Sequence, residues 1–199
     1  MKHEIEVNRK VSVTKVALTG QLRSGKDEIA KHLLIMHGFT RVAFGDELKR
    51  LAHEAFPDVS EFSKPRALYQ QFGQLLREID PDIWVRHVER QVEALINCNG
   101  QFQDHVGIVI TDLRQPNEYE WAKANGFTIV KVTAPVGKRL VRAKAAGDSF
   151  TEADLAHETE SHIEGFAADY EIANDGTVED LWAKVDDMIT NLEARICGK

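Results

Sequence analysis

An α/β fold built on a mainly parallel sheet is predicted by three observations on this 199-residue sequence. Short apolar segments rich in β-branched residues alternate with helical segments, an order that places helices on both faces of a parallel sheet. The first apolar segment runs directly into a glycine-rich loop, which a helical segment follows. No Pro/Gly/Ser-rich linker and no internal repeat interrupts this alternation, so we expect a single domain over residues 1–199.

The first half of the chain provides two strands and a long helical region. VSVTKVALTG reads as a buried strand, and DEIAKHLLIMHG as a helix with Ile29 and Leu33 on one face and Gly38 at its end. FTRVAFGD reads as a short second strand with a polar tip. From Asp46 to about Asn97 no strand is apparent, and a stripe of apolar residues at helical spacing predicts two or three helices there.

The second half supplies three more strands. VGIVIT, FTIVKVTAP and DYEIAND have strand character, and NEYEWAKANG between the first two reads as a short helix closed by glycine. A basic segment and then a polar helix over TEADLAHETESHI precede the last strand. The final segment, TVEDLWAKVDDMITNLEARI, places its apolar residues on one face, which predicts a helix that docks on the core.

Residues 20–26 have the G-x-x-x-x-G-K spacing of a phosphate-binding loop, placed between a predicted strand and a predicted helix. Glycines let the backbone wrap closely around phosphate oxygens, and the helix start adds positive charge at the same place. Lys26 can then reach the β- and γ-phosphates of a nucleoside triphosphate. The alternative is a glycine-rich turn with a surface lysine. The candidate ATP-binding residues here are Gly20, Arg23, Ser24, Gly25, Lys26, Asp27 and Glu28.

Asp27 stands where such loops normally carry the Ser or Thr that touches magnesium. A carboxylate in the first turn of a helix is favourable in itself, so Asp27 could be a simple capping residue. It could equally hold Mg²⁺, directly or through water, because hard cations accept carboxylate oxygen. Both interpretations stay open on the residues alone.

Two further aspartates follow predicted strands. Asp112 comes directly after VGIVIT, which is the Walker-B arrangement of a carboxylate that acts on the metal, and Arg114 would point into the same crevice. We count both among the acceptor-binding candidates, against the alternative of a turn with a salt bridge. Asp46 follows the second strand, where it could position an acceptor oxygen, help hold magnesium or cap the next helix.

A second polar site is indicated in the helical region. Arg66, Gln70, Gln74 and Arg77 recur at helical spacing and form one stripe beside the apolar one. Guanidinium groups bind phosphate through paired hydrogen bonds, so Arg66 and Arg77 are candidate ligands of a phosphorylated acceptor. A solvated helix face is the alternative. Aromatic and amide side chains nearby, Trp84 among them, favour an acceptor with a flat base.

GQLRSGKD with its helix, the following FGDELKRLA, and the pattern R-x-L-x-Q-x-x-G-x-x-x-R-x-x-D-P-D-x-W together resemble the phage-type deoxynucleoside monophosphate kinases. The likeness extends over residues 15–185, and it reaches more distantly to animal-type phosphomevalonate kinase and dephospho-coenzyme A kinase. It implies a three-layer α/β/α P-loop fold with a five-stranded sheet, a helical acceptor-binding region at 46–98 and a short lid at 135–150. The phage-type deoxynucleoside monophosphate kinases and the animal-type phosphomevalonate kinases both tolerate an acidic residue after the loop lysine.

The resemblance also assigns roles to individual residues. It implies that Arg66, Gln70, Arg77 and Trp84 bind the acceptor, and that Arg114 contacts the acceptor phosphate. In the lid, Arg139 and Arg142 share a helix face and would stabilise the transferring phosphoryl group. The strand and loop near the C-terminus resemble those beside the adenine ring, which implies base contacts by Asn174, Gly176 and Thr177, although Thr177 could simply cap the last helix.

The sequence therefore predicts a kinase that transfers the γ-phosphoryl group of ATP to a (deoxy)nucleoside monophosphate, with Mg²⁺ as cofactor. Another small phosphorylated acceptor, or nucleotide binding without transfer, are the alternatives. A net charge of -7 disfavours a nucleic-acid surface, and no apolar run is long enough for a membrane helix. The two distant cysteines favour a cytoplasmic protein, expected as a monomer or homodimer. The histidines lack zinc spacing and are expected to be surface or packing residues.

Overall fold

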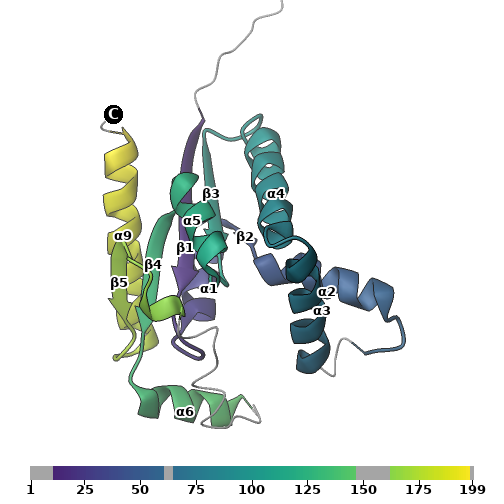
Figure 1. The fold of residues 1–199 in the computed structure, drawn as a ribbon. Coiled ribbons are helices and arrows are strands. Elements are labelled where there is room, and N and C mark those ends of the chain that lie inside the picture. The colour runs from purple at the N-terminus through teal and green to yellow at the C-terminus, as the bar shows by residue number, and fades with distance from the viewer. Residues whose placement is uncertain (1–10, 61–64, 147–161, 198–199) are drawn as a thin grey trace, which may run out of the picture.

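Five parallel strands form the central sheet of the structure, a computed structural model that describes residues 11–60, 65–146 and 162–197 (Figure 1). The strands are β1 (Ser12–Thr19), β2 (Thr40–Val42), β3 (His105–Ile110), β4 (Thr128–Thr133) and β5 (Tyr170–Ala173). Their order across the sheet is β2-β3-β1-β4-β5, and every neighbouring pair is parallel. The predicted α/β class with a five-stranded sheet is confirmed.

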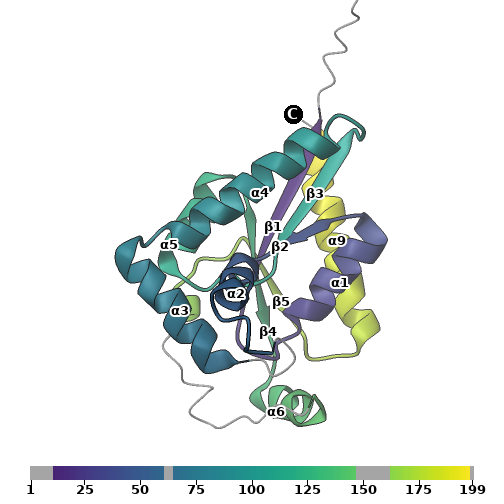
Figure 2. The ribbon, with the colours of Figure 1, turned by 90° about the vertical axis from the view of Figure 1, so that its right-hand side faces the viewer.

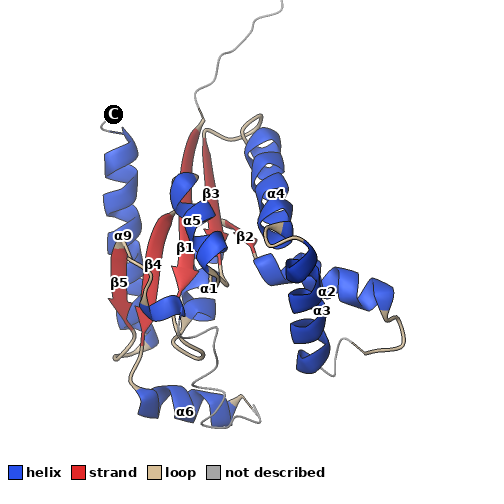
Figure 3. Ribbon diagram, in the orientation of Figure 1, coloured by secondary structure: helices blue, strands red, loops and turns tan. Residues whose placement is uncertain are grey.

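Helices cover both faces of this sheet, as Figure 3 shows. They are α1 (Lys26–His37), α2 (Phe44–Ala55), α3 (Arg66–Ile79), α4 (Ile83–Asn99), α5 (Pro116–Ala124), α6 (Val136–Ala145) and α9 (Val178–Cys197). Successive residues of β1 point to opposite layers: Val16 and Leu18 pack with α1 and α9, and Ala17 packs with α2, α4 and α5. This alternation produces the predicted three-layer α/β/α fold.

The last helix docks on α1 through the apolar face that its sequence predicts. Leu181, Val185, Met188 and Ile189 are each at most 3% exposed, and they share one hydrophobic cluster with residues of α1 and β1. Burying one such side chain stabilises the fold by about 1.5–3 kcal/mol. The helix start is held by a reciprocal cap between Thr177 and Asp180. Thr177 therefore has the capping role considered for it.

Helices α2, α3 and α4 gather beyond the β2–β3 side of the sheet (Figures 1 and 2). Helix α3 approaches α2 closely at Gly73, where an added Cβ would lie 2.5 Å from Leu48 Cδ1. Trp84 of α4 is 1% exposed in the core of this region, and its indole N–H donates to the Gly73 carbonyl at 3.4 Å. The close packing at Gly73 and Trp84 holds α3 at a fixed distance from the sheet.

The start of α2 differs from the cap considered for Asp46. Helix α2 begins at Phe44, so Asp46 lies in its first turn and not at its cap. The cap comes from elsewhere in the chain, since the Asp112 carboxylate accepts the Phe44 and Gly45 N–H groups at 2.9 Å each. Helix α5 is capped by a box formed by Gln115 and Glu118.

The polar helix predicted over residues 151–163 lies largely outside the described residues, as do residues 147–150 of the predicted lid. Among the described helices, none combines the length and the apolar character that crossing a membrane requires.

Candidate active site

The loop between β1 and α1 adopts a backbone path that its glycines make possible. Gly20, Arg23 and Gly25 have φ of 138°, 60° and 112°, in the left-handed range. A Cβ on Gly20 would lie 2.3 Å from the Val132 carbonyl oxygen, and one on Gly25 would lie 2.1 Å from Asn174 Nδ2. The spacing predicted from sequence is therefore required by both backbone angle and space.

Two polar side chains are buried in this loop. The Lys26 ammonium donates to the carbonyls of Gly20 at 2.6 Å and Gln21 at 3.0 Å, so it curls over the loop that it follows. Ser24 is fully buried, and its hydroxyl has no hydrogen-bond partner among the described residues. An unsatisfied buried hydroxyl in a glycine-rich loop at a helix start fits a site that receives an oxygen-rich anion.

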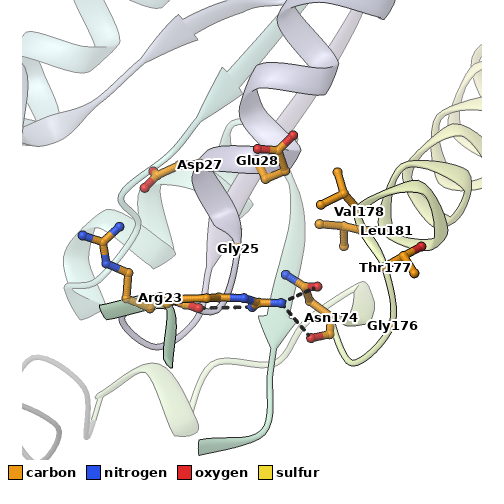
Figure 4. Close-up of a pocket in the computed structure, with 10 residues that line it drawn as sticks. Arg23, Gly25, Asp27, Glu28, Asn174, Gly176, Thr177, Val178 and Leu181 are labelled. Atoms are coloured by element: carbon orange, nitrogen blue, oxygen red, sulfur yellow. Dashed lines mark hydrogen bonds between the residues drawn. The ribbon is translucent and has the colours of Figure 1, made fainter. Parts of the chain in front are cut away.

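A cavity of about 290 Å³, the loop cavity, opens beside the loop between α1 and the start of α9 (Figure 4). Asp27 and Glu28 project from α1 on one side, and Val178 and Leu181 form an apolar wall on the other. Arg142 lines this cavity together with residues that were predicted to bind ATP: Arg23, Gly25, Asp27, Glu28, Asn174, Gly176 and Thr177. The apolar wall was not predicted as part of a site, because its residues read as core positions of the last helix.

Helix α6 lies across the phosphate loop and contacts its backbone (Figure 1). Arg139 is 2% exposed; its Nε donates to the Leu22 carbonyl at 2.8 Å and its Nη1 to Gln21 Oε1. Arg142 donates to the Arg23 carbonyl at 3.3 Å and to Asn174 Oδ1 at 3.0 Å. The two arginines of the predicted lid thus share a face, and both hold the loop.

Asn174 ties the end of β5 to the same loop. It is 5% exposed, and its amide donates to the Ser24 carbonyl at 2.8 Å. Its side-chain oxygen accepts from Arg142, so it links loop, strand and α6. Predicted as a base contact, Asn174 lines the loop cavity but also has this structural role.

A second cavity of about 210 Å³, the α2–α3 cavity, opens at the carboxyl end of β3. It is lined by Phe44, Gly45, Leu48, Lys49, Tyr69, Gln70, Arg77, Asp112, Arg114, Gln115 and Glu118. The structure therefore brings together four predicted acceptor-binding residues: Gln70, Arg77, Asp112 and Arg114. It sits where ligands bind in open α/β sheets, outside the carboxyl ends of the strands.

Three other predicted acceptor residues lie apart from this lining. Arg66 is exposed at the first residue of α3, and Asp46 forms a 2.6 Å ion pair with Arg41 on the surface. Trp84 was expected to contact a base, but the structure places it in the core, where it packs against the apolar side of α2 and α3. On an amphipathic helix, a ring that stacks on a base and a ring that packs in the core have the same sequence pattern. The structure shows that Trp84 is a core residue.

The predicted magnesium candidates gather around one guanidinium that sequence reasoning missed. Arg41 donates a hydrogen bond to the Asp46 carboxylate, and this bond, then the charges of Asp46, Asp112 and Asp27, raise the pKa of Arg41 above its usual value. All three carboxylates are therefore near enough to Arg41 to stabilise its charge. Carboxylate oxygen is the donor that Mg²⁺ prefers, so these residues fit a magnesium ion by their chemistry.

The pKa of the Asp112 carboxyl group is subject to opposing influences. Burial raises its pKa, while the Gly45 and Phe44 N–H donors and the charge of Arg114 lower it; the net direction is upward. Each of its oxygens accepts one backbone N–H and retains a further lone pair. Asp112 therefore both fixes the start of α2 and presents oxygen to the α2–α3 cavity.

Glu118 is a buried acid at the floor of the α2–α3 cavity that was not predicted as a site residue. It is 3% exposed, and its Oε2 accepts the Arg114 and Gln115 N–H groups at 3.0 Å each. Its Oε1 lies 3.8 Å from Arg77 Nη2. Burial, and next the charge of Asp112, raise the pKa of Glu118 to about 7. In the sequence its one sign is its position three residues after Gln115, the spacing of a capping box.

Glu118→Gln is expected to change the pH dependence of stability. A carboxyl whose folded pKa of about 7 lies above its ordinary 4.5 holds its proton more tightly in the native state. The free energy of unfolding then falls as pH rises from about 4.5 to 7, by on the order of 3 kcal/mol from this group. Glutamine cannot titrate, so the variant should lose that part of the slope in urea unfolding measured from pH 4.5 to 8. Parallel curves for the two proteins would contradict a raised pKa.

The sequence matches one protein-family model over more than half of its length. Residues 16–164, well over half of the chain, match the family model described as AAA domain. The match begins in β1 and includes the phosphate loop, both walls of the α2–α3 cavity and α6.

Three viral proteins are similar in sequence. The "Putative deoxynucleotide monophosphate kinase" of Acanthamoeba polyphaga mimivirus is 24% identical over 203 residues, covering 88% of this chain and 96% of that protein. The "Deoxynucleotide monophosphate kinase" of Escherichia phage RB69 is 30% identical over 143 residues, covering 68% of this chain. An uncharacterized protein, ORF77 of Ictalurid herpesvirus 1, is 25% identical over 168 residues, covering 83% of this chain. The chain spans 49% of the phage kinase and 65% of the herpesvirus protein.

The fold also matches solved structures. The Mycobacterium tuberculosis APS kinase CysC, solved in complex with AMPPNP and APS, superposes with a TM-score of 0.54 at 16% identity. The match covers 90% of this chain and 99% of that one. At this identity the likeness concerns the fold, which is the three-layer architecture of P-loop kinases.

Proposed function

The chain belongs to the AAA domain family and has the fold of a P-loop kinase, and from this we propose that it transfers the γ-phosphoryl group of ATP to a (deoxy)nucleoside monophosphate. The α2–α3 cavity carries this proposal, because it brings two arginines and two carboxylates to the edge of the sheet where the phosphate loop begins. The names of two viral relatives, which describe deoxynucleotide monophosphate kinases, support the choice of acceptor.

The donor nucleotide is assigned to the phosphate loop and the loop cavity. The loop N–H groups and Lys26 would bind the phosphates, with Ser24 supplying its unpartnered hydroxyl. The apolar wall of Val178 and Leu181 offers a surface against which a base can pack. Because Lys26 now bonds two loop carbonyls, binding requires it to exchange those partners for phosphate oxygens.

Magnesium is assigned to Asp27 and Asp112, with Asp46 as a further carboxylate in the same region. When bound, the ion neutralises charge on the β- and γ-phosphates. Arg41 already supplies a positive charge near these carboxylates, which offsets part of their mutual repulsion.

The acceptor is assigned to the α2–α3 cavity. Arg77 and Arg114 would bind its phosphate, since guanidinium groups match phosphate oxygens with paired hydrogen bonds. Tyr69 and Gln70 line the same cavity and provide a ring face and an amide edge for a base. Positioning and charge stabilisation accomplish phosphoryl transfer, so no covalent intermediate with the protein is needed.

Arg139 and Arg142 complete the proposed site from α6. They already contact the phosphate loop, so nucleotide binding leaves them next to the transferring group. A helix that covers the loop also limits the access of water, the competing acceptor. We assign to α6 and the segment after it, residues 135–150, the role of a lid.

The proposal is tested by ADP release from ATP and Mg²⁺ with a panel of acceptors. The panel holds the common ribo- and deoxynucleoside monophosphates, phosphomevalonate and dephospho-coenzyme A. We expect one or several deoxynucleotides to stimulate release, with formation of the diphosphate. Stimulation by a non-nucleotide alone would keep the kinase and overturn the acceptor. ATP binding without any stimulated release would overturn phosphoryl transfer itself.

A further inference from the structure

Two histidines and an aspartate from distant parts of the chain meet at the contact between α1 and α9. His32 and His37 lie on α1, and Asp186 lies on α9. The Nε2 atoms of the two imidazoles are 2.6 Å and 2.7 Å from the same oxygen, Asp186 Oδ1. We propose that these three residues bind a divalent transition-metal ion of the Zn²⁺ class, at a site separate from the phosphoryl-transfer centre.

The ligand set has the chemistry of such a site. Imidazole nitrogen and carboxylate oxygen are ordinary zinc ligands, and two histidines with one acid leave further positions open to water. The three candidate ligand atoms lie within 4.8 Å of one another. With metal–ligand bonds of about 2.0–2.1 Å, tetrahedral ligand atoms are about 3.3 Å apart. The two Nε2–Oδ1 distances of 2.6 Å and 2.7 Å must therefore lengthen by about 0.6–0.7 Å to admit the ion, which small side-chain rotations provide.

The surroundings hold the three groups in place. His32 is buried, with 6% of its side chain exposed, and its ring stacks on Trp182 at a centroid distance of 5.2 Å and an angle of 9°. The Trp182 N–H donates to Glu28 Oε1 at 3.2 Å, which fixes the indole in turn. A ligand whose ring is already oriented loses little entropy when a metal binds.

Charge and access favour an ion at this position. In the described part of the chain the ion pairs of Asp186 are with these two imidazoles, and no lysine or arginine neutralises it. Half of the Asp186 side chain and 22% of that of His37 are exposed, which gives an ion a path from solvent. A carboxylate that merely accepts two hydrogen bonds is the competing description, and it predicts no metal affinity.

The position of the site gives it a consequence for the rest of the molecule. The ligands join α1, which follows the phosphate loop, to α9, whose first turns contribute Val178 and Leu181 to the loop cavity. An ion held by both helices would stiffen that contact. This inference does not depend on the proposed acceptor or on catalysis, and its test needs neither.

The test is zinc binding to the full chain, freed of metal by chelator and kept without nucleotide and magnesium. Calorimetry with Zn²⁺ and the visible absorption of Co²⁺ are measured on the protein and on Asp186→Asn and His37→Gln. We expect one equivalent of zinc in the parent protein, and a loss of affinity of tenfold or more in each variant. The melting temperature should rise with zinc in the parent and not in the variants.

His87→Gln is the matched control, since His87 is also partly exposed and has a carboxylate, Glu47, 3.6 Å away, but among the described residues it has no second histidine with which to form a metal-binding group. It should bind zinc as the parent does. The two ligand variants lie at partly exposed positions, and their melting curves without metal establish that they fold. Zinc affinity unchanged in both, or no zinc binding by the parent, would overturn the proposal.

Discussion

Lys26→Ala is expected to lower kcat/KM for phosphoryl transfer by about 100- to 1,000-fold, the effect of removing one charged donor from a preorganised site. The side chain is 8% exposed and rooted at the first residue of α1, so water cannot readily replace it. ATP affinity should fall as well, because the ammonium contacts phosphate in the ground state too. Steady-state rates and calorimetric titration with ATP measure the two effects.

Lys31→Ala is the control for this substitution, because Lys31 lies exposed on the same helix. It should leave rate and affinity unchanged. Lys26→Ala also removes the ammonium that donates to the carbonyls of Gly20 and Gln21, so thermal melts must accompany the kinetics. A folded Lys26→Ala protein with unaltered ATP affinity would contradict the assignment of residues 20–26 to phosphate.

The parts of the fold that sequence predicts well are those set by local chemistry. The glycines of residues 20–26 permit the positive φ that the structure has at Gly20 and Gly25, so the spacing predicts the loop. The inner strands β1, β3 and β4 contain apolar runs because both of their faces are covered, whereas the short edge strands β2 and β5 alternate with exposed Arg41 and Glu171. The order of the strands, in contrast, depends on crossovers that composition does not encode.

The corrections arise where distant residues meet. The start of α2 is set by Asp112, 68 positions away, so a local search for a cap at Asp46 found the wrong residue. Arg41 gathers the carboxylates only because β2 lies beside β3. The histidines appeared scattered because their partner, Asp186, lies 154 positions from His32 and joins it only when α9 docks.

The candidate site residues also divide into those that local sequence predicts and those that depend on packing between distant segments. Arg77, Asp112 and Arg114 were predicted from chemistry at a strand end or on a helix face, and they line one cavity. Trp84 was selected by residue type within a helical pattern, which cannot separate a base-stacking ring from a core ring. Glu118 was not predicted, because the sequence does not distinguish a buried acid from an ordinary helix-capping glutamate; the packing around it does.

Arg114→Ala is expected to raise the KM for the acceptor by about 10- to 100-fold, with ATP affinity unchanged. A hydrogen bond to a charged partner contributes about 1.5–3 kcal/mol, which corresponds to that range. Arg114 lines the α2–α3 cavity and lies outside the lining of the loop cavity, so the effect should be confined to one substrate. Arg90→Ala, at an exposed position of α4, is the control.

The stronger test combines this variant with Arg77→Ala. If both guanidinium groups bind the same acceptor phosphate, the double variant should lose less than the sum of the two single losses, because either removal already disturbs the shared ligand. Arg77 also lies 3.8 Å from Glu118, so its loss raises the pKa of that acid further. Strict additivity at every pH would place the two arginines on different groups and contradict a single phosphate site.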